Sequence, residues 1–210
     1  MLKLLKVALF GLMLPVATNA AQYEEGNHYE VVTDRASKKP EVVEFFSFYC
    51  PACNAYEKII ADVKPHLDND VEFKKSHVDF VGVRDPEIQT LLAQALAAAD
   101  VLPEKDAIIA ALFNHFHGKR AKINELADVK DIFVSTGVDA DKFDKIFNSF
   151  AVRTKASKMA RDQQYYSEKR ALTGVPTFIV NGKYKLRLRE SKTTEPEQIA
   201  ALINYLSKKN

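Results

Sequence analysis

The two cysteines of this 210-residue chain, Cys50 and Cys53, stand three positions apart in the stretch "FFSFYCPACNAYEKII". Three kinds of chemistry use such a pair: half of a metal site, a small structural disulfide, or a reversible redox couple. A structural zinc site needs four ligands. The chain has no second cysteine pair, and His115 and His117, two positions apart, point to different sides of a helix. The sequence therefore predicts no metal site.

A purely structural disulfide between Cys50 and Cys53 is the second alternative. It would close a loop of only the four residues from Cys50 to Cys53, for which the chain-entropy relation gives about 2 kcal/mol. A chain that is 47% hydrophobic can form a packed core without this contribution. A structural bridge would therefore stabilise the domain little.

The redox interpretation explains where the pair lies in the sequence. An apolar run ends just before Cys50, and Pro51 suits the first position of a helix, where no backbone N–H is needed. Unpaired N–H groups and the helix dipole at that end favour the thiolate of Cys50, the form that reacts in disulfide exchange. Cys53, one turn further along, is expected to be less exposed and to resolve a mixed disulfide. A Cys-x-x-Cys pair in an α/β context is a strong redox signal.

Two further features could serve this pair. Glu44 interrupts the apolar run before Cys50, and a buried carboxyl group has a raised pKa, so Glu44 could carry a proton for Cys53. A carboxylate on an exposed edge, or in an ordinary ion pair, is the other interpretation of Glu44. Val175-Pro176 opens a predicted strand, where proline is tolerated as the first residue or after a cis peptide bond. A cis bond would leave the preceding backbone free to pair with a substrate chain.

The elements that must position these residues follow an α/β order. The run 40–49 predicts a strand buried on both faces, and 71–80 predicts a second strand. Asn181-Gly182 predicts a hairpin between strands at 174–180 and 183–189. Helical spacing predicts helices over 86–99, 105–116, 125–137, 139–150, 152–172 and 195–208. Because most of these helices fall in one block inside an α/β order, the sequence predicts an inserted helical domain.

The first twenty residues have the pattern of a secretory signal peptide. Lys3 and Lys6 precede the apolar run "VALFGLMLPVA", and Thr18 and Ala20 occupy the small-residue positions before a cleavage site. A buried N-terminal helix is the alternative. Removing the two lysines lowers Lys+Arg from 30 to 28, equal to Asp+Glu at 28, so a neutral mature chain gives no electrostatic reason to bind nucleic acid or anionic membrane. Export would place the cysteines where disulfides persist.

Four segments together resemble the DsbA family of periplasmic thiol:disulfide oxidoreductases: "AQYEEGNHY", "EFFSFYCPAC", "KKSHVDF" and "TGVPTFIVNGKY". The resemblance covers nearly the whole chain after residue 20, in the same order. It implies an α/β thioredoxin fold with an inserted all-helical domain. The implied boundaries are a signal peptide at 1–20, a thioredoxin-like domain at 21–80 plus 164–210, and the helical domain at 81–163.

The resemblance also implies roles for individual residues. Cys50 matches the exposed nucleophile and Cys53 its buried partner. Glu44 matches the buried acid, and Lys75 matches its charged neighbour. Val175-Pro176 matches the cis-proline loop, which contacts the substrate. No cofactor and no metal are implied.

The activity that the resemblance implies is donation of the Cys50–Cys53 disulfide to unfolded exported proteins with reduced cysteines, in the periplasm. A DsbB-type, quinone-coupled membrane partner would then reoxidise the protein, which is expected to be a monomer. A reductase or isomerase on the same fold, and a periplasmic chaperone-like binding module, are the alternatives. Ala52 departs from the family pattern, which most often has His there, so the strength of oxidation is left open.

Overall fold

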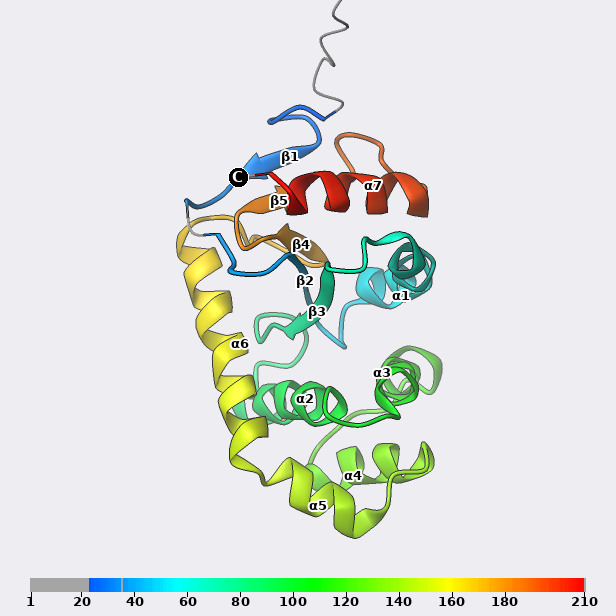
Figure 1. Cartoon of the computed structure of the whole chain (residues 1–210). Helices are drawn as coiled ribbons and strands as arrows, with labels where there is room; N and C mark the ends of the chain where they lie inside the picture. Colours follow the sequence, from blue (N-terminus) through cyan, green and yellow to red (C-terminus); the bar gives the residue numbers. More distant parts are fainter. Residues whose placement is uncertain (1–22, 35, 210) are drawn as a thin grey trace, which may run out of the picture.

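A computed structural model describes residues 23–34 and 36–209, and the predicted signal peptide lies outside them (Figure 1). The five strands of this part form one sheet in the order β1-β5-β4-β2-β3. The strands β2 and β3 run parallel, whereas the pairs β2–β4, β4–β5 and β1–β5 are antiparallel. Their bounds are β1 Tyr29–Val31, β2 Glu41–Phe46, β3 Glu72–His77, β4 Thr177–Val180 and β5 Tyr184–Leu186.

The strand β2 lies inside the sheet, between β3 and β4. Its residues Val42, Glu44, Phe45 and Phe46 are all buried, which confirms the expectation of a strand covered on both faces. The hairpin after β4 is also confirmed, because Asn181 and Gly182 both have positive φ angles, as a tight turn between antiparallel strands requires.

Helices cover both faces of the sheet. In Figure 1 the helices α1 (Pro51–Val63) and α7 (Pro196–Ser207) lie on one side of the strands, and α6 (Phe150–Glu168) lies on the other. Ile60 of α1 and Ile203 of α7 share a buried cluster with Val42. On the α6 side, Phe45 packs edge-on against Tyr166, with the ring centroids 5.3 Å apart.

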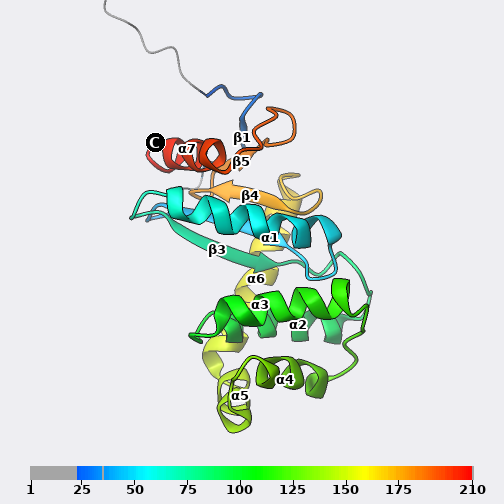
Figure 2. The same cartoon turned by 90° about the vertical axis from the view of Figure 1, so that its right-hand side faces the viewer.

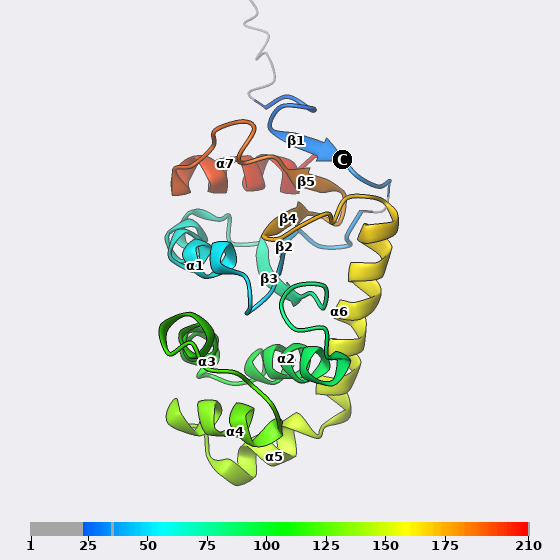
Figure 3. The same ribbon diagram turned by 180° about the vertical axis from the view of Figure 1, so that it is seen from behind.

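The remaining helices form a separate layer below the sheet, as Figure 2 shows, and α6 connects that layer to the sheet (Figure 3). They are α2 (Pro86–Ala99), α3 (Lys105–Phe113), α4 (Leu126–Ser135) and α5 (Ala140–Phe147). Their apolar cluster includes Leu92, Leu96 and Phe113, and it extends to Phe46 and Phe48 at the end of β2. The helical layer therefore packs directly against the loop that carries Cys50. The α/β class with a helical insertion is confirmed.

Several predicted elements end earlier than the sequence pattern indicated. The helix expected over 152–172 spans Phe150–Glu168, because Arg170, rather than Gly174, takes the left-handed conformation that terminates it (φ 56°). The strand expected over 183–189 is only Tyr184–Leu186. The domain boundary at 163/164 falls within α6 and stays a prediction. None of the helices in the described ranges has the length and hydrophobicity needed to span a membrane.

Candidate active site

Cys50 is the N-cap of α1, at the junction between the buried strand and the helix. Its backbone is extended, its N–H donates to the Ser47 carbonyl at 3.0 Å, and Pro51 is the first helical residue. The Cys50 sulfur accepts a hydrogen bond from the backbone N–H of Cys53 at 3.3 Å. A donor at the end of a helix stabilises a negative charge on this sulfur. A negative charge that develops on the Cys50 sulfur during disulfide exchange would therefore meet a backbone donor.

Cys53 lies one turn inside the helix and has no exposed surface, and both cysteines are free thiols in this structure. Burial raises the pKa of the Cys53 thiol, and the neighbouring Cys50 and the charge of Glu44 raise it further. A thiolate at Cys53 is therefore costly. When Cys53 leaves a disulfide, it must gain a proton promptly.

The expectation that Cys50 is exposed holds only in comparison with Cys53, because Cys50 is 7% exposed. It is recessed beneath the loop that precedes β4, and its sulfur lies 3.7 Å from the carbonyl oxygen of Val175. A reacting partner must therefore approach Cys50 along this loop.

The peptide bond between Val175 and Pro176 is cis. A groove of about 460 Å³ runs beside it, and Ala52, Val175 and Pro176 are among the residues that line the groove. Ala52, two positions after Cys50, thus lines the groove, and as a methyl group its side chain offers no hydrogen bond. The groove is lined by apolar residues around Val175 and by the charged residues Lys185, Arg189 and Glu190.

Glu44 and Lys75 form a buried ion pair under the cysteines. The two residues are direct partners in the register of β2 and β3, and Lys75 Nζ donates to Glu44 Oε2. Glu44 is completely buried and Lys75 is 7% exposed. Burial alone would lower the pKa of Lys75, but the carboxylates of Glu44 and Glu57 raise it, so the ammonium group keeps its charge.

A third residue, Glu57, completes this network. Its Oε1 lies 2.5 Å from Lys75 Nζ, and its side chain is 27% exposed. Burial raises the pKa of Glu44 to about 7, Lys75 opposes this shift, and the charge of Glu57 adds to it. Glu57 and Lys75 also line a cavity of about 650 Å³ between α1 and α3. Two of the three residues of the network, Glu57 and Lys75, therefore face this cavity, whereas Glu44 does not line it.

Two histidines hold the loop between β2 and α1. The backbone N–H of Phe48 donates to His77 Nε2 at 3.3 Å, and the Phe48 carbonyl lies 2.9 Å from His117 Nε2. His77 is on β3, whereas His117 is in the π-helical turn Asn114–Gly118 after α3. The sheet and the helical layer thus both position the segment just before Cys50.

The fold brings the predicted residues into one region. Cys50 approaches Val175 next to Pro176, and the charge of Glu44, the ion-pair partner of Lys75, raises the pKa of Cys53. A sulfur that accepts a helix N–H, a buried thiol and a carboxyl group with a pKa of about 7 together can exchange disulfides and move the accompanying proton.

Sequence reasoning missed three residues of this region: Glu57, His77 and His117. Glu57 follows Cys53 by four positions, so both lie on one face of α1, and that spacing could have identified it. The two histidines carry no comparable signal, because their contacts with Phe48 come from distant elements.

Comparisons with known proteins place the whole chain among disulfide-exchange proteins. The family model of the DSBA-like thioredoxin domain matches residues 41–201. The thiol:disulfide interchange protein DsbA of Escherichia coli (strain K12) is 34% identical over 218 aligned residues, covering 99% of this chain and all of the relative. The protein of the same name from Salmonella typhi is 33% identical over 215 residues, covering 98% of each chain.

Solved structures agree with these sequence matches. The disulfide oxidoreductase DsbA from Proteus mirabilis has a TM-score of 0.76 and 28% identity, covering 89% of this chain and 98% of its own. A complex of a cysteine-to-serine variant of the Proteus protein with the non-covalently bound peptide PWATCDS has a TM-score of 0.77 and 29% identity. It covers 90% of this chain and all of the Proteus chain. The thioredoxin fold with a helical insertion is thereby confirmed.

Proposed function

Because this chain belongs to the DSBA-like thioredoxin domain family and is a thiol:disulfide oxidoreductase, we propose that it oxidises exported proteins by donating a Cys50–Cys53 disulfide. The observation that carries this proposal is the contrast between the two sulfurs. Cys50 accepts a helix N–H at the end of α1, whereas Cys53 is fully buried with a raised pKa. Disulfide exchange needs one sulfur that substrates can reach and a second sulfur that is buried away from them.

The reaction begins with the oxidised protein. A thiolate of the substrate attacks the Cys50 sulfur, the Cys50–Cys53 bond breaks, and its electron pair leaves with Cys53. A second thiolate of the substrate then attacks the substrate sulfur of the mixed disulfide and displaces Cys50 as a thiolate. The substrate loses two electrons and gains a disulfide, and the protein ends as the dithiol.

Glu44 is proposed to supply the proton that the departing Cys53 requires. A carboxyl group whose pKa is about 7 is partly protonated near neutral pH, so it can act as an acid during disulfide donation and as a base in the reverse reaction. Lys75 holds this carboxyl group in place, and Glu57 is proposed to connect it to solvent.

Val175 and Pro176 are proposed to bind the substrate chain. The groove beside them lies next to Ala52 and Cys50, and the backbone of Val175 can pair with an extended polypeptide. The Proteus relative was solved with a short cysteine-containing peptide, which supports a peptide as the occupant of this groove. Side chains contribute little to the pairing, so one site can accept many unfolded sequences.

The remaining partners follow from the same chemistry. A protein that donates its disulfide must be reoxidised before the next cycle. We propose that a DsbB-type, quinone-coupled partner in the inner membrane reoxidises it. The signal-like pattern of residues 1–20 supports export to the periplasm. The chain is proposed to act there as a monomer.

Oxidation of a reduced, unfolded protein by the purified oxidised chain tests this proposal. One equivalent should form one substrate disulfide, and the Cys50→Ser variant should form none. A glutathione equilibrium separates donor from reductase, because a donor is reduced by glutathione at ratios that leave a reductase oxidised. If Cys50→Ser keeps full activity in preventing aggregation and the oxidised chain transfers no disulfide, the protein is a binding module instead.

A further inference from the structure

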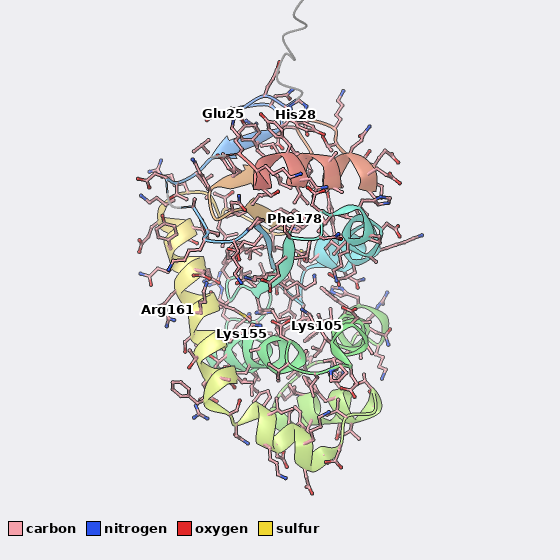
Figure 4. The ribbon with its side chains drawn as sticks, in the orientation of Figure 1. Glu25, His28, Lys105, Lys155, Arg161 and Phe178 are labelled. Atoms are coloured by element: carbon pink, nitrogen blue, oxygen red, sulfur yellow. The ribbon has the colours of Figure 1, made fainter. Side chains whose placement is uncertain are left out.

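The groove beside Pro176 has an apolar part. Phe178 of β4 (Figure 4) and Leu186 of β5 line it and are 7% and 6% exposed. Tyr56 of α1 also lines it and packs against Phe178, with the ring centroids 5.8 Å apart. An extended polypeptide that lies in the groove can therefore place an apolar side chain against this part.

The charged part of the groove comes from β5 and from the turn that follows it. Lys185, Arg189 and Glu190 are the charged residues of the lining. Two of these side chains are positive and one is negative, so the lining has a net positive charge. Arg189 and Glu190 are exposed, which leaves their charged ends accessible to a bound chain. A substrate in the groove therefore meets a positively charged surface.

Neighbouring residues offset the charges of Lys185 and Glu190, but not that of Arg189. Lys185 Nζ lies 3.8 Å from Glu30 Oε2, and Glu190 Oε1 lies 4.0 Å from Arg187 Nη2. In the part of the chain that the structure describes, the Arg189 side chain has neither a carboxylate within ion-pair distance nor a hydrogen bond. Its guanidinium group is therefore available to an acidic partner.

We propose, on the basis of the proposed role of this groove in substrate binding, that Arg189 makes it select reduced proteins whose reacting cysteine lies beside acidic residues. A guanidinium group matches the geometry of a carboxylate with two N–H donors. This pair forms while the substrate backbone lies along Val175, whose carbonyl oxygen is 3.7 Å from the Cys50 sulfur. Backbone pairing accepts many sequences, and Arg189 adds a preference among them.

Oxidation of three dithiol peptides by the oxidised full chain tests this inference. The peptides differ only beside their cysteines, where they carry aspartate, asparagine or lysine. We expect the ratio of the second-order rate constants, aspartate peptide over lysine peptide, to fall about threefold or more in Arg189→Gln. Arg189→Glu should lower this ratio further. Comparing the same peptides across variants cancels the intrinsic reactivity of their thiols.

Salt and a matched variant separate charge at the groove from other causes. Raising the ionic strength from about 0.01 M to about 1 M shortens the screening length from about 30 Å to about 3 Å, so the effect of Arg189→Gln should disappear at high salt. Lys58→Gln is the control, because Lys58 is an exposed residue of α1 that does not line the groove. It removes the same charge and should leave the ratio unchanged.

Three results would overturn the inference. An equal ratio in the unmodified chain and in Arg189→Gln would show that Arg189 does not meet the substrate. An equal fall in Lys58→Gln would trace the preference to the general charge of the protein. An effect of Arg189→Gln that persists at about 1 M salt would point to a changed groove shape rather than to charge.

Failure of this inference can be distinguished from failure of the proposed function. If the unmodified chain oxidises the asparagine peptide and shows no charge preference that depends on Arg189, disulfide donation stands and the role of Arg189 is refuted. If it oxidises none of the three peptides, the proposed disulfide donation is refuted, and with it the selection that rests on it.

Discussion

Glu44 on β2 and Lys75 on β3 face each other directly across the only parallel strand pair among the described residues, and they form an ion pair inside the protein. The neighbouring β4 covers Glu44 from the other side, with Phe178 as its register partner (Figure 4). Glu44 has no exposed surface, so its negative charge is costly even beside Lys75. Burial therefore raises the pKa of Glu44 to about 7. The proposed role of Glu44 depends on this balance.

We predict that Glu44 makes the dithiol form less stable as the pH rises. A carboxyl group whose pKa is raised from 4.5 to about 7 keeps its proton in the folded state over this range, while the unfolded state loses it. The contribution of Glu44 to the unfolding free energy is therefore at its maximum below pH 4.5 and is lost as the pH rises through 7. At 1.36 kcal/mol per pKa unit the loss is about 3 kcal/mol.

Urea unfolding of the chain and of Glu44→Gln between pH 4 and 8 measures this contribution. The difference in unfolding free energy between the two should change across this range by roughly that amount. Glu41→Gln is the matched control, since Glu41 also pairs with a lysine of β3, but Lys74 and Ser37 lower its pKa despite partial burial. A pH dependence unchanged by Glu44→Gln would assign the titration to another group.

A second prediction concerns the rate of disulfide donation. If Glu44 protonates the departing Cys53, Glu44→Gln should slow oxidation of a dithiol peptide by about tenfold or more below pH 7, with a smaller effect above it. Removing the charge of Glu57 lowers the pKa of Glu44, so Glu57→Gln should move the midpoint of this effect to lower pH. Stopped-flow measurements would show both. Equal rates for the chain and Glu44→Gln from pH 5 to 8 would make Glu44 a structural residue.

His77 should affect stability in the opposite direction. Its pKa is lowered from 6.5 to about 3 by burial, so below pH 6.5 the unfolded state gains a proton that the folded state refuses. The chain should lose up to about 5 kcal/mol from this site as the pH falls from 6.5 to 3. The variant His77→Phe keeps a ring against Phe48 but cannot take up a proton. The unfolding free energy of the unmodified chain should therefore fall, relative to that of His77→Phe, as the pH falls. A constant difference between the two proteins would show that His77 is already solvated.

The sequence predicted the position of Cys50 at the start of a helix better than it predicted the elements around it. The position of Cys50 follows from local rules, because Pro51 and the end of an apolar run define a helix start. The strand β1 was missed, since three residues are too few to show a period and Tyr29 is buried only through its pairing with β5. His77 was missed for a similar reason: its burial depends on Phe48 and the helical layer, which no local pattern encodes.

Ala52 is the position at which the oxidising strength can be tested. It is exposed and lines the groove beside Val175, so a histidine there would reach the Cys50 sulfur without displacing core residues. A charge-assisted contact of about 1.5–3 kcal/mol would raise the reduction potential of Ala52→His by about 30–60 mV, at 1.4 kcal/mol per 30 mV. A glutathione equilibrium for both proteins measures this difference. Potentials that agree within about 10 mV would mean that the end of α1 alone sets the value.

The most direct test of the central claim, that Cys50 meets the substrate and Cys53 resolves, compares two single-cysteine variants. Cys53→Ala and Cys50→Ala would each be mixed with a peptide whose cysteine is activated as a mixed disulfide, and the covalent adduct would be followed by mass. We predict that Cys53→Ala forms the adduct rapidly and that Cys50→Ala reacts at least about 100-fold more slowly, because its remaining sulfur is buried and protonated. Equal rates, or faster reaction at Cys53, would contradict it.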